Sequence, residues 1–162
     1  SMLFGFGRGR GRTQPHDDTV TVQIQSPTMN SRKITGTIII DAPVTDVWTI
    51  LTDYDRLAVH VPNLVQSYRK PHPRGDDFIR LFQEGAQNII GFDFKASLTM
   101  DMFEDGLDSV QKRTIDFTLV DSAMFNGFDG QWRAELFSRI PNPSSTNRDD
   151  EYIYTTKLTY NV

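Results

Sequence analysis

Residues 34–64 read ITGTIIIDAPVTDVWTILTDYDRLAVHVPNL, and this stretch decides the fold. It opens with an apolar, β-branched run over residues 34–40, which predicts a strand. After Pro43 the apolar residues recur at the period of a helix, and Pro43 suits a first helical turn because its missing N–H costs nothing there. One stripe of this helix is apolar: Val44, Val47, Trp48 and Leu51. A second short apolar segment, residues 57–59, ends before Pro62 and predicts another small helix.

Strands predominate in the rest of the chain, separated by turn signals such as Asp105-Gly106. The predicted strands cover residues 20–24, 34–40, 65–70, 78–84, 92–103, 110–120, 127–137 and 152–160. In the longest strand every second residue is apolar: Phe92, Phe94, Ala96, Leu98, Met100 and Met102. The intervening residues, from Asp93 to Asp101, are polar. This alternation indicates an antiparallel sheet with one dry and one wet face, and the order of elements predicts an α+β protein.

The same residues resemble a known family. The motifs are Ala42-Pro43, Val47-Trp48, Leu51-Thr52-Asp53-Tyr54 and Pro62-Asn63-Leu64, followed by those at residues 80–83, 91–94, 113–117 and 128–132. Over about residues 32–162 the chain resembles the START-like, or helix-grip (SRPBCC), superfamily, in its polyketide cyclase/dehydrase and lipid transport branch. That branch includes the coenzyme Q-binding proteins, and the later motifs are similar to its plant and cyanobacterial members. The resemblance implies a curved antiparallel sheet that grips a C-terminal helix, with a ligand cavity between them.

The composition excludes several kinds of site and partner. The 162 residues are 38% hydrophobic and 23% charged, which is ordinary for a globular protein. Because the chain has no cysteine, it has no disulfide, thiolate nucleophile or Cys-based metal site. Its net charge of −4 does not attract nucleic acid, and no run approaches the roughly 20 apolar residues of a membrane helix. We therefore expect neither a nucleic-acid partner nor an integral membrane segment.

Residues 1–18 are predicted to form a flexible tail, because their Gly/Arg alternation has no core-forming period. An Arg-Gly tail for nucleic acid is the alternative, but three arginines are too few to favour it. We predict one START-like domain over residues 19–162. The likeness to plant and cyanobacterial proteins implies a plastid location, with a targeting peptide absent from this sequence, and the coenzyme Q-binding branch implies the mitochondrion as the alternative.

The end of the chain departs from the family pattern. The sequence stops at Val162, directly after the strand predicted over residues 152–160, so we expect the C-terminal helix of the family to be missing. Sheet residues that this helix would cover, among them Leu98, Phe117 and Trp132, are then expected to be exposed. A second copy could cover them, so we expect self-association through the ligand face or by exchange of segments.

Catalytic and metal-binding patterns are weak. The three histidines, His16, His60 and His72, form no ligand-spaced pair with one another or with a carboxylate on a predicted helix, so no metal or other cofactor is predicted. Asp53 and Asp55 lie at a helix junction, where capping and solvation are favoured over paired-carboxylate catalysis. We therefore expect a binding protein more than an enzyme.

The candidate site is an apolar concavity with a few polar groups. Its predicted ligand-binding residues are Gln83, Phe92, Phe94, Leu98, Met100, Arg113, Phe117 and Trp132. Gln83 and Arg113 are in phase with apolar neighbours, so both are expected to point inward and orient a polar head. The alternatives are that the aromatic residues are simply core, and that Arg113 forms a structural salt bridge with Glu84 or Asp116.

We therefore expect the chain to bind and sequester or transport a hydrophobic small molecule, such as a lipid or an isoprenoid, on the concave face of the sheet. Two other functions stay open: an aromatase/cyclase-like enzyme that uses the same cavity, and an interaction module whose sheet face receives a partner's helix. Turnover of a polyketide-like substrate would indicate the first, and a stable protein complex without extractable lipid the second. The fold alone does not distinguish these functions.

Overall fold

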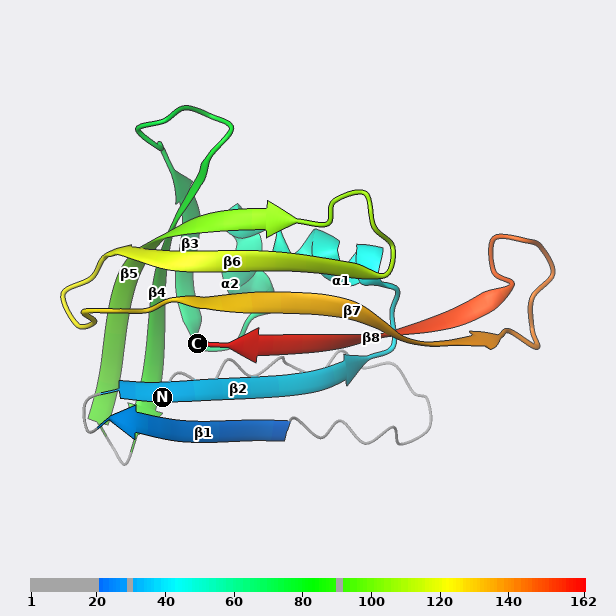
Figure 1. Ribbon diagram of the computed structural model, residues 1–162, viewed down its shortest axis with the longest axis horizontal. Helices are drawn as coiled ribbons and strands as arrows, with labels where there is room; N and C mark the ends of the chain where they lie inside the picture. The colour runs from blue at the N-terminus through cyan, green and yellow to red at the C-terminus, as the bar shows by residue number, and fades with distance from the viewer. Residues whose placement is uncertain (1–20, 29–30, 90–91) are drawn as a thin grey trace. The chain divides into compact units, whose positions relative to one another are not determined.

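The computed structural model describes the backbone of residues 21–28, 31–89 and 92–162 and the side chains of residues 33–86 and 95–162 (Figure 1). The elements, in chain order, are β1 (Thr21–Thr28), β2 (Ser31–Ile40), α1 (Val44–Leu51), the 3-10 turn η1 (Tyr54–Arg56), α2 (Leu57–His60), β3 (Leu64–Lys70), β4 (Ile79–Ile89), β5 (Phe92–Asp105), β6 (Lys112–Asp121), β7 (Gly130–Pro141) and β8 (Tyr152–Asn161). Each predicted strand and each predicted helix has a counterpart. The tail predicted over residues 1–18 lies outside the described residues.

The strands follow the order β1-β2-β8-β7-β6-β5-β4-β3 in one sheet. Antiparallel register joins β1 to β2, β2 to β8 and β8 to β7 at one end of this order, and β5 to β4 and β4 to β3 at the other. The fold class predicted from the sequence is therefore confirmed. It is an α+β fold with a curved antiparallel sheet and two short helices after the strand that begins the deciding stretch.

The chain divides into two compact units, which we describe separately. The first unit includes Ile50–Phe103 and Asp116–Asp129, and therefore η1, α2, β3, β4 and most of β5. The second unit includes Glu104–Ile115, Gly130–Val162 and the described residues up to Thr49, and therefore β1, β2, β7, β8 and most of α1. Buried apolar side chains of the first unit are Leu51, Tyr54, Leu57, Leu64, Leu81, Ala96, Leu98, Met100, Met102 and Phe117. Those of the second unit are Val44, Val47, Trp48, Ile115, Ala134 and Leu158.

Helix α1 buries the stripe that the sequence predicts. The four residues of this stripe are each at most 7% exposed: Val44, Val47, Trp48 and Leu51. The carbonyl of Pro43 accepts a hydrogen bond from the N–H of Val47 (3.2 Å), so the helix begins directly after this proline. In the second unit, the Thr156 hydroxyl on β8 donates to the carbonyl of Ala42 (2.7 Å). This bond satisfies a backbone group at the helix entrance and ties that entrance to the sheet.

Candidate functional site

The candidate ligand-binding face of the first unit is built by β4 and β5. Their register places Leu81 opposite Met100 and Gln83 opposite Leu98, so these four side chains lie on one face of the hairpin. Leu81 is 0% exposed, Leu98 5% and Met100 4%. The predicted dry face of the long strand is therefore dry where its side chains are described. Phe92 and Phe94 belong to the same predicted set, but their side chains lie outside the described part of the chain.

The opposite face of β5 is less wet than the alternation predicts. Thr99 is only 6% exposed, although it is in phase with exposed Lys95. Thr99 lies opposite Phe82 of β4, whose ring packs against that of Tyr68 on β3 at 4.9 Å between centroids. The outer face of this hairpin therefore carries an aromatic pair beside the threonine, and residue type alone did not predict the burial of Thr99.

A polar row crosses the otherwise apolar face of the first unit. The side-chain amide of Gln83 donates to the hydroxyl of Ser67 on β3 (3.4 Å), and this hydroxyl donates to the carbonyl of Tyr54 in η1 (2.5 Å). The Ser67–Tyr54 bond is short and buried, whereas the Gln83–Ser67 bond is at the long limit of hydrogen bonding. Gln83 is also half-buried, so its amide is the polar group of this face that a ligand could engage.

The junction carboxylates fix the short helices. The Asp55 carboxylate accepts from the N–H of Arg69 on β3 (2.7 Å), which anchors η1 to that strand. Asp53 precedes η1 without a side-chain cap and contacts the ring of His60 instead (3.3 Å). Both side chains of the Asp53–His60 pair are about one-third exposed, at 34% and 31%, so water weakens this interaction. Capping and solvation were predicted for these aspartates: Asp53 makes no side-chain cap but is partly exposed to water, and exposed Asp55 bonds across to β3.

Leu98 and Phe117 are buried, and the expectation that both are exposed is wrong. Phe117 on β6 is 2% exposed, and the ring of Phe128, in the segment after β6, lies 5.9 Å from its ring. That segment is held in place because the Ser122 hydroxyl donates to the carbonyl of Ser97 on β5 (2.9 Å). The strand predicted over residues 127–137 begins only at Gly130, and Phe128, in the segment before it, supplies apolar cover within the first unit.

Arg113 and Trp132 lie in the second unit, each beside an aromatic ring. The Arg113 guanidinium carbon is 5.7 Å from the ring centroid of Trp48 on α1, and its Nε donates to the carbonyl of Ser109 (2.7 Å). These contacts, a cation–π interaction and a backbone hydrogen bond, stabilise the half-buried charge of Arg113. Trp132 is half-buried and packs against Tyr160 at 4.5 Å between ring centroids. Burial raises the pKa of Tyr160 above its ordinary value.

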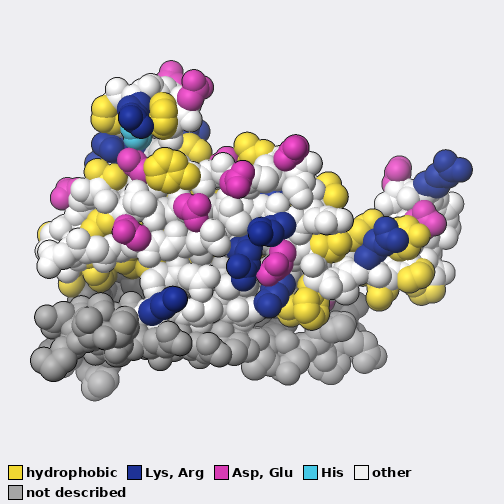
Figure 2. Space-filling view, viewed as in Figure 1, with side chains coloured by type: hydrophobic (Ala, Val, Ile, Leu, Met, Phe, Trp, Pro, Cys, Tyr) yellow, Lys and Arg dark blue, Asp and Glu magenta, His cyan; other side chains and the backbone are white. Residues whose placement is uncertain are grey.

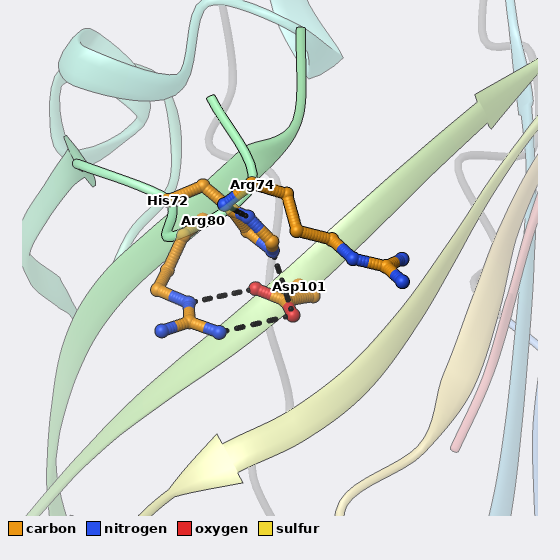
Figure 3. Close-up of polar contacts among 4 residues, drawn as sticks. All are labelled: His72, Arg74, Arg80 and Asp101. Atoms are coloured by element: carbon orange, nitrogen blue, oxygen red, sulfur yellow. Dashed lines mark hydrogen bonds and ion pairs between the residues drawn. The ribbon is translucent and has the colours of Figure 1, made fainter. Parts of the chain in front are cut away.

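A second polar cluster, which the sequence did not predict, joins the β3–β4 loop to β5 (Figure 3). The Asp101 carboxylate accepts from Arg80 on β4 at 2.9 and 3.2 Å, and its Oδ2 lies 3.2 Å from Nε2 of His72. The hydrogen bonds from Arg80 lower the pKa of Asp101, with a smaller contribution from His72, and the Asp101 contact raises the pKa of Arg80. The His72 side chain is 8% exposed, and its ring stacks on Phe78.

The hydrogen bonds of His72 define its tautomer. Nδ1 accepts from the N–H of Arg74 (3.0 Å), so the proton of the neutral ring is on Nε2, which donates to Asp101. Both ring nitrogens are therefore occupied. His72 holds the loop on the strand, and it has no lone pair left to act as a general base.

The described residues contain no group of three or more His, Asp or Glu side chains that could hold a metal ion. None of the helices in the described part is long and apolar enough to cross a membrane. The sequence matches the family described as polyketide cyclase / dehydrase and lipid transport over residues 40–161. No protein with a curated description matches the chain.

Two solved structures show the same fold at low sequence identity. A STAR-related lipid transfer protein from Xanthomonas axonopodis (fragment 25–204) is 14% identical with a TM-score of 0.54, over 92% of this chain and 77% of that one. A START superfamily protein from Mycobacterium smegmatis is 11% identical with a TM-score of 0.50, over 80% of this chain and 75% of that one. Since the family match runs from the end of β2 to the end of β8, the chain belongs to the polyketide cyclase / dehydrase and lipid transport family.

Proposed function

We propose that the chain binds a hydrophobic small molecule, such as a lipid or an isoprenoid, and sequesters or transports it. The observation that carries the proposal is the β4–β5 face, where buried Leu81, Leu98 and Met100 surround one half-buried amide, that of Gln83. An apolar surface with few polar groups is the usual design of a site for such ligands. The family description names lipid transport, which supports this choice of ligand class.

The driving force is transfer of the ligand's apolar surface out of water, at about 25 cal/mol per Å² buried. Gln83 can give direction to the bound molecule, because its amide donates weakly to Ser67 and can hydrogen-bond a carbonyl or hydroxyl of the ligand instead. The other predicted lining residues of the first unit, Phe92, Phe94 and Phe117, belong to the proposal as further contacts. Arg113 and Trp132 lie in the second unit, and their part in binding stays a prediction.

Burial of the face has a consequence for ligand uptake. Leu98 and Met100 are 5% and 4% exposed, so a ligand that reaches them must displace the groups that cover them. Uptake should therefore require local opening of the protein. The polar head of the ligand should first bind half-buried Gln83, and its apolar chain should enter afterwards. Slow, temperature-dependent association is the expected kinetic signature.

The direct experiment is mass spectrometry of organic extracts from the purified protein, with a fluorescent fatty acid as binding probe. We expect Gln83→Leu to weaken probe binding about 2- to 10-fold, the scale of one neutral hydrogen bond of about 0.5–1.5 kcal/mol. Gln66→Leu is the matched control, because Gln66 is exposed on β3 and lies opposite Glu84 rather than on the apolar face. Thermal unfolding of both variants monitors the fold.

An empty extract together with no probe binding would reject the proposal. If Gln83→Leu and Gln66→Leu lost the same amount of probe affinity, the polar group that orients the ligand would not be Gln83. Turnover of a polyketide-like substrate by the same protein would favour the cyclase function that the family description also names.

A further inference from the structure

Strands β7 and β8 continue beyond the rest of the second unit as a two-stranded arm (Figure 1). The register between β2 and β8 ends at Ile40 opposite Thr156, and the N–H of Leu136 bonds to the carbonyl of Gln111, just before β6 begins. Residues 137–141 and 152–155 lie past these points and pair only with each other in the described part of this unit. We call them the arm, and residues 142–151 are its tip.

One face of the arm carries an exposed pair of isoleucines. Ile140 and Ile153 lie directly opposite each other and are 54% and 42% exposed. The next pair on this face, Ser138 and Thr155, is joined by a hydrogen bond between the two hydroxyls. A solvated two-stranded ribbon is marginally stable alone, and exposed β-branched pairs on it favour contact with a further surface.

On the other face of the arm, the side chains contact one another. The Arg139 guanidinium carbon lies 4.2 Å from the ring centroid of Tyr152, and the rings of Tyr152 and Tyr154 are 6.4 Å apart. This cation–π contact joins β7 to β8 on the face opposite the isoleucines and stabilises the arm. The isoleucine face is therefore a preorganised surface, which lowers the entropic cost of docking.

Charges of opposite sign lie on either side of the isoleucine pair. The tip contains Arg148, Asp149, Asp150 and Glu151, a formal net charge of −2. On the other side, Lys157 is in phase with Ile153 along β8. The register shift between Leu136 and Ser138 places Glu135 opposite Lys157 and brings Arg133 to the same face, so these three residues have a formal net charge of +1. The side chains of Arg133 and Glu135 pair at 3.2 Å, so the amine of Lys157 is the main source of this positive charge. Figure 2 shows basic and acidic side chains gathered over β7 and β8 in the same view as the arm.

We propose that the isoleucine face of the arm docks on the same face of a second copy, about a two-fold axis at Ile140 and Ile153. A two-fold axis places identical apolar pairs against each other and reverses the direction of one arm. The acidic tip of each copy then faces Lys157 of the other, at similar distances from the axis. The single surface is thus complementary to itself in hydrophobicity and charge.

The same charges argue against a membrane surface as the occupant. The tip would meet the bilayer first, and its three carboxylates, Asp149, Asp150 and Glu151, would be repelled by anionic headgroups and costly to desolvate. Two small apolar pairs make a contact below the usual size of a stable interface, so we expect a dimer that dissociates at micromolar concentrations.

Cysteine crosslinking gives the sharpest test, because this chain has no cysteine. Two copies of residue 140 lie at the proposed axis, so Ile140→Cys should form a disulfide-linked dimer under mild oxidation. Val110→Cys is the matched control, since Val110 is 67% exposed in the β5–β6 loop and outside the arm. Crosslinking of the residue 140 variant at least tenfold faster than the control supports the proposal, and equal rates overturn it.

Sedimentation of charge variants tests the pairing across the axis. Lys157→Glu and Asp150→Lys should each raise the dissociation constant of the dimer about tenfold, the scale of one cross-interface charge pair. The double variant should recover much of the loss, because its charges are again complementary. A double variant no tighter than the single ones, with all three folded by circular dichroism, contradicts the two-fold arrangement.

Discussion

At the scale of single residues, Asp101 shows how one carboxylate can connect three chain segments. It accepts from Arg80 on the neighbouring strand and from His72 in the loop, and the pairing with Arg80 holds its pKa below the ordinary value. A group whose pKa is depressed in the folded state contributes stability above its unfolded pKa and loses that contribution as the pH falls through the folded pKa. Acid should therefore loosen the β3–β4 loop.

We expect Asp101→Asn to lower the midpoint of thermal unfolding at neutral pH, because Arg80 and His72 lose their charged acceptor. The difference between the natural chain and the variant should be constant down to about pH 4, near the unfolded pKa of an aspartate, and shrink below it. Thermal scans from pH 2 to pH 7 measure it. A difference that persists unchanged at pH 2 would contradict the assignment of the charged form.

At the scale of elements, the turn between β5 and β6 depends on a glycine. Gly106 has φ of +79°, and a Cβ added there would lie 2.5 Å from the carbonyl oxygen of Lys112. Both the dihedral and the close approach exclude a side chain. The Asp105-Gly106 turn signal in the sequence therefore has a physical cause in the hairpin.

We predict that Gly106→Ala lowers the free energy of unfolding by roughly 1–3 kcal/mol, the usual cost of a residue held in a sparsely populated backbone region. Gly127→Ala is the control, because Gly127 has no atom within 4 Å of an added Cβ and no positive φ. Chemical denaturation of both variants provides the measurement. Equal effects would mean that the turn relaxes around the new methyl group.

At the scale of the whole molecule, the proposed ligand face and the proposed dimer face belong to different compact units. Gln83, Leu98 and Met100 are in the first unit, whereas Ile140 and Ile153 are in the second. The sequence predicted self-association through the ligand face. Leu98 and Met100 of that face are buried, so it does not offer exposed apolar surface to a second copy. Self-association stays a prediction, and the arm gives it a different location.

Binding and association should therefore be separable. We expect Ile140→Glu to weaken the dimer at least tenfold while probe affinity changes by less than about twofold, since substitutions at independent sites do not couple. Gln83→Leu should do the reverse. If both variants lost dimerisation and probe binding together, the result would indicate that the dimer forms through the ligand face.

The sequence by itself determined the elements and their faces. Local backbone geometry and the burial of one face set the periods of apolar residues in strands and helices. Strands β2 and β5 and helix α1 therefore lie where residues 34–64 and 92–103 predict them. The dry face of β5 followed for the same reason, because alternation alone selects Leu98 and Met100.

Only the tertiary structure decided which side chains meet. His72 and Asp101 are 29 residues apart, and Arg113 reaches Trp48 on a helix that no local pattern connects to β6. Such pairs depend on strand register, turn length and the cover supplied by segments such as the one that carries Phe128. The arm also depends on where neighbouring strands end. These features arise from packing between distant segments, which local periodicity does not encode.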